Sequence, residues 1–478
     1  MRIDGKGLLE TMLARICSDE DFSSSKHWLY SSAFWGIIAM SFGVLLAIKF
    51  VAPDFLSNLP QASIGRIRPS HVLTALFGFV SMGLVGAVLY IVPRLTGVKL
   101  WSERLGNFTM VAWNLAVLFT DLTLLTGHTE GREYAEQIAP IAVVTMIGLV
   151  SVAIIVFRTV QERKEKQLYI SLWYFMGTFL WFPLVYLIGH RSFVRLSGLN
   201  DAAVNWFYGH NVLGLWFTTL GVGVVYYLIP IISRAPLFSH KLSLIGFWSI
   251  AMVYAPTGAH HLLQAPIPEW LKSAAIVSSL LLLIPVFAAV TNFLVTVRGR
   301  FDIVMNNLAL RWTITGVICY LITCLQGPFQ AARPVNWYIH FTNWVVAHAH
   351  IALLGSFGFF VYGATYHMIP RITGRRLYSV ALGEAHYWLV TIGFIGFFFA
   401  LTMAGLEQAS MWNLGVPEYQ VFVQLYPLMV LRFLSGVMML IGHCIFAWML
   451  LRTVTAREPA TPMERAIVDA IVPPAVGS

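Results

Sequence analysis

The sequence predicts an all-α fold, a polytopic membrane bundle of twelve transmembrane helices. Of the 478 residues, 58% are hydrophobic and 11% are charged, and the mean hydropathy is +0.72, whereas a soluble domain is about 25% charged. Apolar segments of about 20 residues, the length that crosses a bilayer, occur twelve times. The expected spans cover residues 30–52, 71–93, 107–127, 139–160, 168–189, 203–231, 242–264, 272–297, 308–330, 338–370, 382–404 and 421–451. We expect one domain without an internal repeat.

Basic residues predict the orientation of the bundle. Alternate loops are richer in Lys and Arg, and the positive-inside rule places such loops in the cytoplasm together with both termini. We therefore expect a cytoplasmic N-terminal segment over 1–29, a twelve-helix domain over 30–453 and a flexible cytoplasmic tail over 454–478. The net charge of +9 resides in these loops, so it does not indicate binding to nucleic acid.

Two histidines stand two residues apart in the tenth expected span. Histidine is costly to bury in lipid, so His348 and His350 indicate a functional site. Residues two apart on a helix point about 200° away from each other. The two imidazoles therefore cannot bind one metal, but each can hold a different one, such as two haem irons on opposite sides of one helix. The alternative is a pair of histidines hydrogen-bonded to neighbouring helices.

Another histidine lies at the start of the second span. The segment Arg66-Ile67-Arg68-Pro69-Ser70-His71 opens that span, and Pro69 suits the first turn of a helix. His71 is a candidate second axial ligand of a haem, with Arg68 one turn away as a partner for the haem propionates. The alternative is an interfacial histidine that meets water.

Three histidines from the sixth and seventh spans form a candidate metal site. His210 opens the sixth span, and His260 and His261 stand together in the seventh, a ligand count that suits copper or zinc. Adjacent residues diverge by about 100° on an ideal helix. Pro256 and Gly258 precede the pair and can relax the backbone so that both reach one metal.

Tyr254 is the candidate active-site phenol. It precedes His261 by seven residues, which on a regular helix puts both side chains on one face two turns apart. A phenol beside a metal ligand is placed to give a proton and an electron.

The expected outer loop after the third span is rich in carboxylates. It reads Gly131-Arg132-Glu133-Tyr134-Ala135-Glu136, which suits a hard cation such as calcium and equally suits a solvated loop.

These residues resemble the haem–copper oxygen reductase superfamily, and most closely the catalytic subunit I of cbb3-type (C-family) cytochrome c oxidases. The resemblance is carried by Arg68-Pro69-Ser70-His71, Gly131-Arg132-Glu133-Tyr134-Ala135-Glu136, Tyr208-Gly209-His210-Asn211, Tyr254 with His260-His261, Gln326-Gly327-Pro328, and His340-Phe341-Thr342-Asn343-Trp344 followed by His348-Ala349-His350. It implies a terminal oxidase of the cell inner membrane that reduces O2 to water with electrons from cytochrome c and takes protons up from the cytoplasm.

The resemblance also implies the cofactors and their ligands: two b-type haems, one copper ion and a possible calcium ion. The implied ligands are His71 and His350 for the low-spin haem, His348 for the high-spin haem, and His210, His260 and His261 for copper. The other implied roles are a covalent link from Tyr254 to His210, contacts to the haem propionates from Arg68 and His340, a calcium ligand in Glu133, and a proton path through Tyr226, Ser243, Tyr320 and Gln326.

Electrons must come from elsewhere, because the sequence has no Cys-x-x-Cys-His motif that would attach a c-type haem. The resemblance implies membrane-anchored cytochrome c subunits, with a soluble or membrane cytochrome c as donor.

Two positions depart from the family's pattern. Gln326 and Asn343 stand where the family has Glu and Asp. Glutamine cannot ionise, so proton delivery past this point needs water or Tyr320 instead, and proton pumping is left open.

Two other protein classes remain as alternatives. Nitric oxide reductases share the six-histidine plan but hold non-haem iron, with a Glu ligand in the span that begins at the first metal-binding histidine. Residues 211–216 here contain no Glu, and those enzymes lack an equivalent of Tyr254, so the oxidase is favoured. A twelve-span secondary transporter needs only hydrophobic, broken helices, but it leaves the six histidines unexplained.

Overall fold

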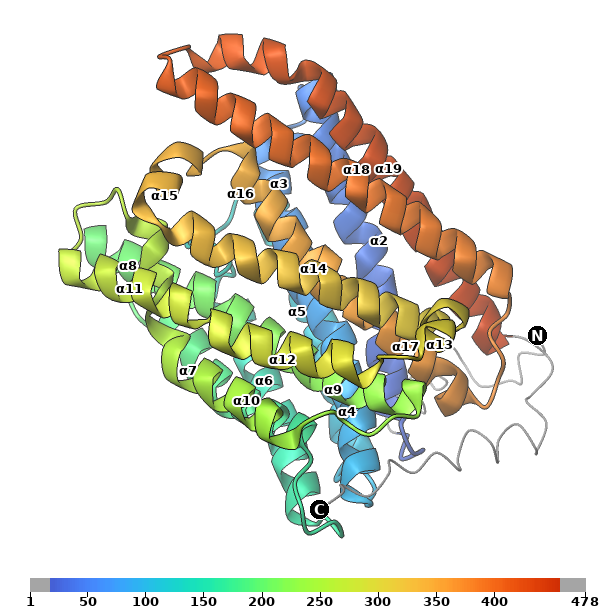
Figure 1. Cartoon of the computed structure of the whole chain (residues 1–478). Coiled ribbons are helices and arrows are strands. Elements are labelled where there is room, and N and C mark those ends of the chain that lie inside the picture. The colour runs from blue at the N-terminus through green and yellow to red at the C-terminus, as the bar shows by residue number, and fades with distance from the viewer. Residues whose placement is uncertain (1–17, 456–478) are drawn as a thin grey trace.

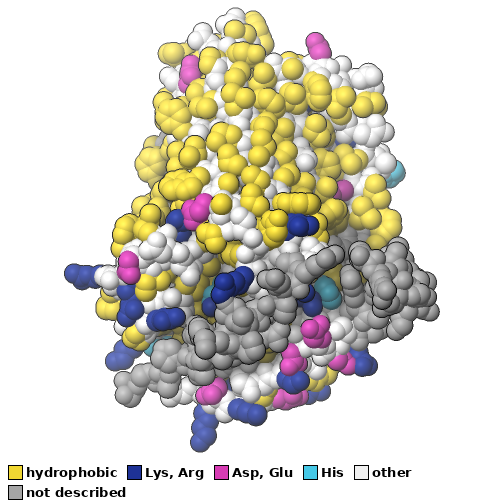
Figure 2. Space-filling view, turned by 90° about the vertical axis from the view of Figure 1, so that its right-hand side faces the viewer, with side chains coloured by type: hydrophobic (Ala, Val, Ile, Leu, Met, Phe, Trp, Pro, Cys, Tyr) yellow, Lys and Arg dark blue, Asp and Glu magenta, His cyan; other side chains and the backbone are white. Residues whose placement is uncertain are grey.

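The computed structural model describes residues 18–455 as helices joined by loops, with no strand in that range (Figure 1). Eleven helices in this part of the chain are long and apolar enough to cross a membrane, and a pair bent by 54° makes a twelfth span. The predicted all-α bundle of twelve spans is confirmed. Outward-facing apolar side chains such as Phe108, Leu184 and Met252 are exposed, and Figure 2 shows hydrophobic side chains covering the upper part of one face. Such a surface suits contact with lipid.

The helices follow one another in chain order with short connections. Their bounds are α2 (Ser23–Val51), η1 (Pro60–Ala62), α3 (Ile64–Leu73), η2 (Thr74–Val80), α4 (Ser81–Thr96), α5 (Glu103–Leu125), α6 (Ala139–Gln161), α7 (Ile170–Gly189), α8 (Gly198–Val212), η3 (Leu213–Thr218), α9 (Thr219–Ser233), α10 (His240–Val253), η4 (Ala255–Leu262), α11 (Glu269–Leu281), α12 (Leu283–Thr296), α13 (Phe301–Asn306), α14 (Leu308–Ala331), α15 (Arg333–Ile339), α16 (Asn343–His350), η5 (Ile351–Gly358), α17 (Phe359–Thr373), α18 (Val380–Asn413) and α19 (Glu418–Thr455).

Several expected boundaries are wrong. The second span begins at Ile64 rather than at 71, so Pro69 lies inside α3 and not at its start, and the eleventh ends at Asn413 rather than at 404. Helix α2 begins at Ser23 rather than at residue 30, so the segment before the first span is shorter than expected. The tenth span begins at Asn343 rather than at 338, because Phe341 adopts a left-handed conformation (φ 66°) and the Thr342 hydroxyl caps the new helix. Residues 1–17 and 456–478, which include nearly all of the expected tail, lie outside the described residues.

Three spans end in the same turn, contrary to the expectation of no internal repeat. In each turn, a proline carbonyl accepts a hydrogen bond from the backbone amide of the residue four positions later. That residue adopts the left-handed conformation that ends many helices. The pairs are Pro93 with Gly97, Pro230 with Arg234, and Pro370 with Gly374. The second, sixth and tenth spans are therefore equivalent positions in a threefold repeat.

The repeat continues into the next helix of each unit. Five residues after the turn, a serine hydroxyl caps α5, α10 or α18; these residues are Ser102, Ser239 and Ser379. The aromatic residue before each serine donates its amide to a threonine near the end of the fourth, eighth or twelfth span; these are Thr159, Thr296 and Thr453. The chain thus consists of three units of four spans.

Each repeated inner span also contains a π-helical segment. These segments are η2, η3 and η5, and each begins within three residues of a histidine that the sequence marks as a ligand: His71, His210 or His350. A π segment shifts the register of a helix and is frequent at functional sites. Each unit therefore carries a candidate ligand histidine close to the start of its π segment, although His71 lies two residues further from the repeated proline than His210 and His350 do.

Candidate metal and cofactor centre

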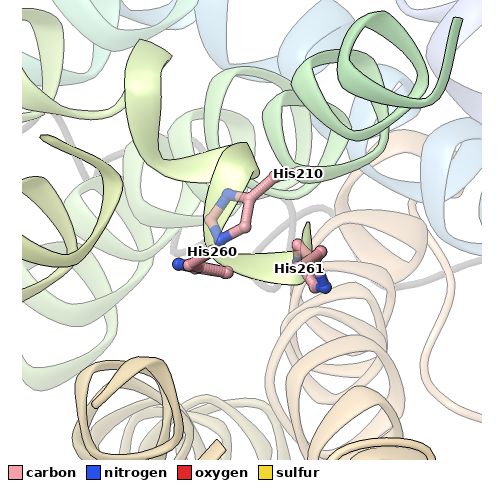
Figure 3. A group of neighbouring side chains, drawn as sticks. All are labelled: His210, His260 and His261. Atoms are coloured by element: carbon pink, nitrogen blue, oxygen red, sulfur yellow. The ribbon is translucent and has the colours of Figure 1, made fainter. Parts of the chain in front are cut away.

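Three of the predicted ligands lie together. His210 projects from α8, and His260 and His261 project from η4 (Figure 3), with one ligand atom of each lying within 4.8 Å of the others. Nitrogens bound to one metal at about 2.0 Å are at most about 4 Å apart, so a small inward movement of the rings completes a chelating geometry. The donor set of three imidazoles fits copper.

A sharp bend brings η4 against α8. The seventh span turns by 54° between α10 and η4, where Pro256 lacks an amide for the helix ladder. A Cβ at Gly258 would lie 2.2 Å from the Trp206 carbonyl oxygen, so only glycine permits this backbone approach. The expectation that a regular helix joins Tyr254 to His261 is wrong, because η4 is a 3-10 helix.

Hydrogen bonds orient two of these imidazoles. The Ser279 hydroxyl donates to the Ala275 carbonyl, so it accepts from His260 Nδ1 at 2.7 Å. The Thr257 hydroxyl likewise donates to the Tyr254 carbonyl and accepts from His210 Nδ1 at 3.1 Å. In both rings the proton is fixed on Nδ1, which leaves Nε2 free to bind a metal.

Tyr254 lies beside the three histidines. Its ring centre is 5.1 Å from that of His210, and the side chain is buried. A Cβ at Gly214, one helical turn after His210, would lie 1.8 Å from Tyr254 Cε1. The phenol of one span therefore occupies the space that a side chain of another span leaves open. The sequence analysis identified neither Gly214 nor Ser279 as a site residue. Gly214 could have been found because it stands four residues, about one helical turn, after His210.

A second pair of imidazoles faces each other across a gap. The ring centres of His71 and His350 are 6.1 Å apart and the ring planes differ by 19°. Bonds of about 2.0 Å to a metal, plus about 1.1 Å from nitrogen to ring centre, put two axial imidazoles about 6 Å apart. His71 Nδ1 donates to the Ala39 carbonyl and His350 Nδ1 to the Val346 carbonyl, so both Nε2 atoms are free. The pair fits the axial ligands of a haem iron.

His348 belongs to the other side of the same helix. It lines a cavity of about 190 Å3 together with His210, His260, His261 and Tyr254. Its Nδ1 lies 3.2 Å from Gln326 Oε1, and an amide oxygen only accepts, so Nδ1 carries the proton. His348 and His350 of α16 therefore face different surroundings, the cavity and His71 respectively.

The loop after α5 is anchored by the buried Arg132. Its guanidinium donates to the Gly189 and Val194 carbonyls and forms an ion pair with Asp201. Glu133 forms an ion pair with Arg68. Burial, and secondarily the neighbouring Glu133, raises the pKa of Glu136 to about 8. One carboxylate oxygen of Glu136 has no hydrogen-bond partner in the described part of the chain. This pair of acids fits a bound cation.

His340 lies between α15 and α16, outside the spans. Its ring stacks on Phe341 with centres 3.9 Å apart, and its Nδ1 has no partner. Burial lowers its pKa, so the ring is neutral at pH 7.

Three of the predicted proton-path residues, Tyr226, Ser243 and Tyr320, are buried, and Gln326 is half-buried. The Ser243 hydroxyl donates to the His240 carbonyl, and Tyr226 packs against Tyr174 with ring centres 5.6 Å apart. The Tyr174 hydroxyl has no hydrogen-bond partner among the described residues. It lies 3.2 Å from the position that a Cβ on Gly246 would take, and Gly246 is on α10, the helix that also carries Ser243. Tyr174, which the sequence analysis did not mark, therefore joins α9 to α10. Tyr320 lines the cavity.

The fold and site define a membrane protein in which one helix carries two histidines that face opposite sides, His350 toward His71 and His348 toward the three-histidine group. The family model described as "Cytochrome C and Quinol oxidase polypeptide I" matches residues 24–438. The chain belongs to this family, the haem–copper oxidase subunit I family, whose members hold haems and copper.

Three known proteins show the similarity. The cbb3-type cytochrome c oxidase subunit CcoN1 of Stutzerimonas stutzeri is 31% identical over 89% of this chain and 93% of its own length. A nitric oxide reductase chain of the same organism is 28% identical over 84% of this chain and 88% of its own length. A solved haem–copper terminal oxidase dimer has a chain with a TM-score of 0.72 and 16% identity, covering 93% of this chain and 89% of that one; this match shows the fold.

Proposed function

We propose that the chain is the catalytic subunit of a cbb3-like cytochrome c oxidase, which reduces O2 to water with electrons from cytochrome c and takes up protons from the cytoplasm. One observation carries the proposal. On α16, His350 faces His71 while His348 faces the cavity with the three-histidine group. An electron acceptor and a reaction site are thereby separated by the width of one helix.

The cofactors proposed are two b-type haems and one copper ion. His71 and His350 would hold the low-spin haem, and His348 the high-spin haem. The copper would be held by the three remaining ligands, His210, His260 and His261. When bound, these groups supply the electron transfer and the activation of O2.

The chain's own residues position this chemistry and supply protons. Ser279 fixes the His260 ring and Gln326 the His348 ring. Tyr254 is buried beside His210 and can donate its phenolic hydrogen to the cavity. A covalent bond from the Tyr254 ring to a nitrogen of His210 removes two hydrogen atoms, for which O2 is the acceptor. If His210 were to hold the metal through Nε2, the bond to Tyr254 would form at Nδ1 in place of the present hydrogen bond to Thr257.

Protons are proposed to enter from the cytoplasmic side through Ser243, Tyr226, Tyr174 and Tyr320. Phenols and hydroxyls buried in a span mark proton relays. Gln326 bonds His348 but cannot ionise, so it positions this path without carrying a proton. The hydroxyl of Tyr320 therefore makes the last proposed step before Tyr254.

The surroundings follow from the same assignment. We place the chain in the cell inner membrane with both termini in the cytoplasm, next to membrane-anchored cytochrome c subunits that pass on electrons from a soluble or membrane cytochrome c. Arg68 and His340 would meet the haem propionates. Glu133 and Glu136 would bind calcium, supported by the unpartnered oxygen of Glu136.

Nitric oxide reduction is the second candidate, supported by the similarity to the nitric oxide reductase chain of Stutzerimonas stutzeri. Two features of this chain favour the oxidase. The residue one turn after His210, where a carboxylate would face the metal, is Gly214, and the Tyr254 ring fills the space beside it.

The test is the metal content of the purified complex. Reduced-minus-oxidised spectra and elemental analysis should give two b-type haems and one copper per chain. Two haems with non-haem iron would support nitric oxide reductase instead. A preparation without haem would contradict both.

A further inference from the structure

Arg432 is a charged side chain buried in the membrane part of α19. Only 8% of it is exposed. Its guanidinium stacks over Phe50 at 4.7 Å from the ring centre, and its one polar contact among residues 18–455 is Met429 Sδ at 3.9 Å. The Nε atom has no hydrogen-bond partner, and no ion pair within residues 18–455 includes this arginine.

An arginine without an anion is costly at such a position. Charged groups inside spans are rare and almost always paired, because the low dielectric penalises a lone charge. The guanidinium is a fork of five donors that matches a carboxylate. The contacts of Arg432 leave most of these donors unused, so the protein alone does not complete this site.

The position of Arg432 indicates where the anion lies. Its charge is close enough to act on both His71 and His350. Helix α19 packs along α2 (Figure 1). On α2, a Cβ at Gly43 would lie 2.9 Å from His71, and Phe50 stands seven residues, about 10 Å, further along. Arg432 is therefore displaced from the two imidazoles toward the end of the span at which α3 begins.

We infer that Arg432 is the counter-ion for a carboxylate of the group held between His71 and His350, which makes it a second propionate partner of the low-spin haem. This rests on the proposed haem site. Arg68, the partner marked by the sequence, is already paired with Glu133. Arg432 has no such competitor, and its burial makes its charge the less screened of the two.

Arg432 then acts as a positioning residue that tunes electron transfer. A fixed positive charge near the haem favours the reduced form, which carries one more electron. It also holds the carboxylate ionised and fixes the rotation of the ring plane between the two imidazoles.

The experiment compares Arg432→Gln and Arg432→Lys with the native complex. The control is Arg452→Gln, which removes the same charge from the cytoplasmic end of α19, where Arg452 stacks on Tyr378 and Trp448. The readouts are haem content, the midpoint potential of the low-spin haem, and redox-difference infrared spectra with haem labelled by 13C at the propionate carboxyls.

Arg432→Gln should lower the equilibrium constant for reduction of the low-spin haem at least tenfold, which lowers its midpoint potential by about 59 mV for a one-electron couple. It should also shift the infrared bands of the labelled carboxylates. Arg432→Lys should recover most of the potential, and Arg452→Gln should leave it unchanged. Loss of the low-spin haem from Arg432→Gln but not from Arg432→Lys also supports a charge-dependent contact.

Unchanged potential and unchanged labelled bands in Arg432→Gln would overturn the inference, as would a lysine variant that behaves like the glutamine variant. A native complex without a low-spin haem would instead contradict the proposed function, so the two failures are distinguishable.

Discussion

Replacing Gly214 by alanine should drive Tyr254 away from His210. The new Cβ would stand 1.8 Å from Tyr254 Cε1 and 2.0 Å from Cζ. Carbon atoms in ordinary contact are about 3.5 Å apart, so the ring has to retreat by about 1.7 Å. Only 9% of the Tyr254 side chain is exposed, so the space for this movement must come from the cavity that it lines.

The expected loss is larger in activity than in stability. Overpacking a buried site costs about 1–3 kcal/mol, which leaves the bundle folded. A misplacement of about 1 Å in an active site can cost about 100-fold in rate, so oxygen reduction by Gly214→Ala should fall at least about 100-fold while both haems and copper are retained.

Oxygen consumption, metal content and peptide mapping of the Tyr254–His210 link check this prediction. Gly436→Ala is the control, because a Cβ there meets only Val44 at an ordinary 3.8 Å, and it should behave like the native chain. Native activity together with an intact link in Gly214→Ala would refute the argument that glycine makes room for the tyrosine.

Three other predictions follow from contacts around the site. Ser279→Ala removes the acceptor for His260 Nδ1 and should lower copper affinity about 10- to 100-fold, measured by competition with a chelator; Ser278→Ala should not, and equal losses would contradict the role of the hydroxyl. Gln326→Glu places a carboxylate against the His348 imidazole, which stabilises oxidised iron. The midpoint potential of the high-spin haem should therefore fall by on the order of 60 mV, a tenfold change in the equilibrium constant for reduction, and a redox titration without a shift would count against this prediction. Glu136, with its pKa raised to about 8, keeps its proton below that pH, so calcium must displace it: apparent affinity should rise about tenfold per pH unit from pH 6 to 8 and then level off. Calorimetry in buffers of different ionisation enthalpy should show the released proton, and a flat pH profile would contradict the assignment.

The sequence by itself determined the class of fold and the principal ligands. A bilayer requires about 20 apolar residues for each span, so hydropathy alone gave the twelve spans. Histidines are so rarely tolerated in such segments that His71, His348 and His350 stood out without a structure. The opposed directions of the last two follow from helical geometry, which is local.

The threefold repeat was present in the sequence but hidden. The prolines and the cap serines match in residue type and spacing, but the residue that ends each turn does not, since Gly97 and Gly374 correspond to Arg234. Short matches of this kind are common by chance in apolar spans, so the repeat became clear only when the turns, caps and threonine contacts could be compared in the structure.

Only the tertiary structure decided which distant residues meet. The bend at Pro256 and the close approach at Gly258 depend on how η4 packs against α8, about 50 residues away in sequence. The Tyr254–Gly214 contact and the unpaired charge of Arg432 likewise arise between spans. Hydropathy and helical period describe one helix at a time, whereas these sites are set by the packing of several helices against one another.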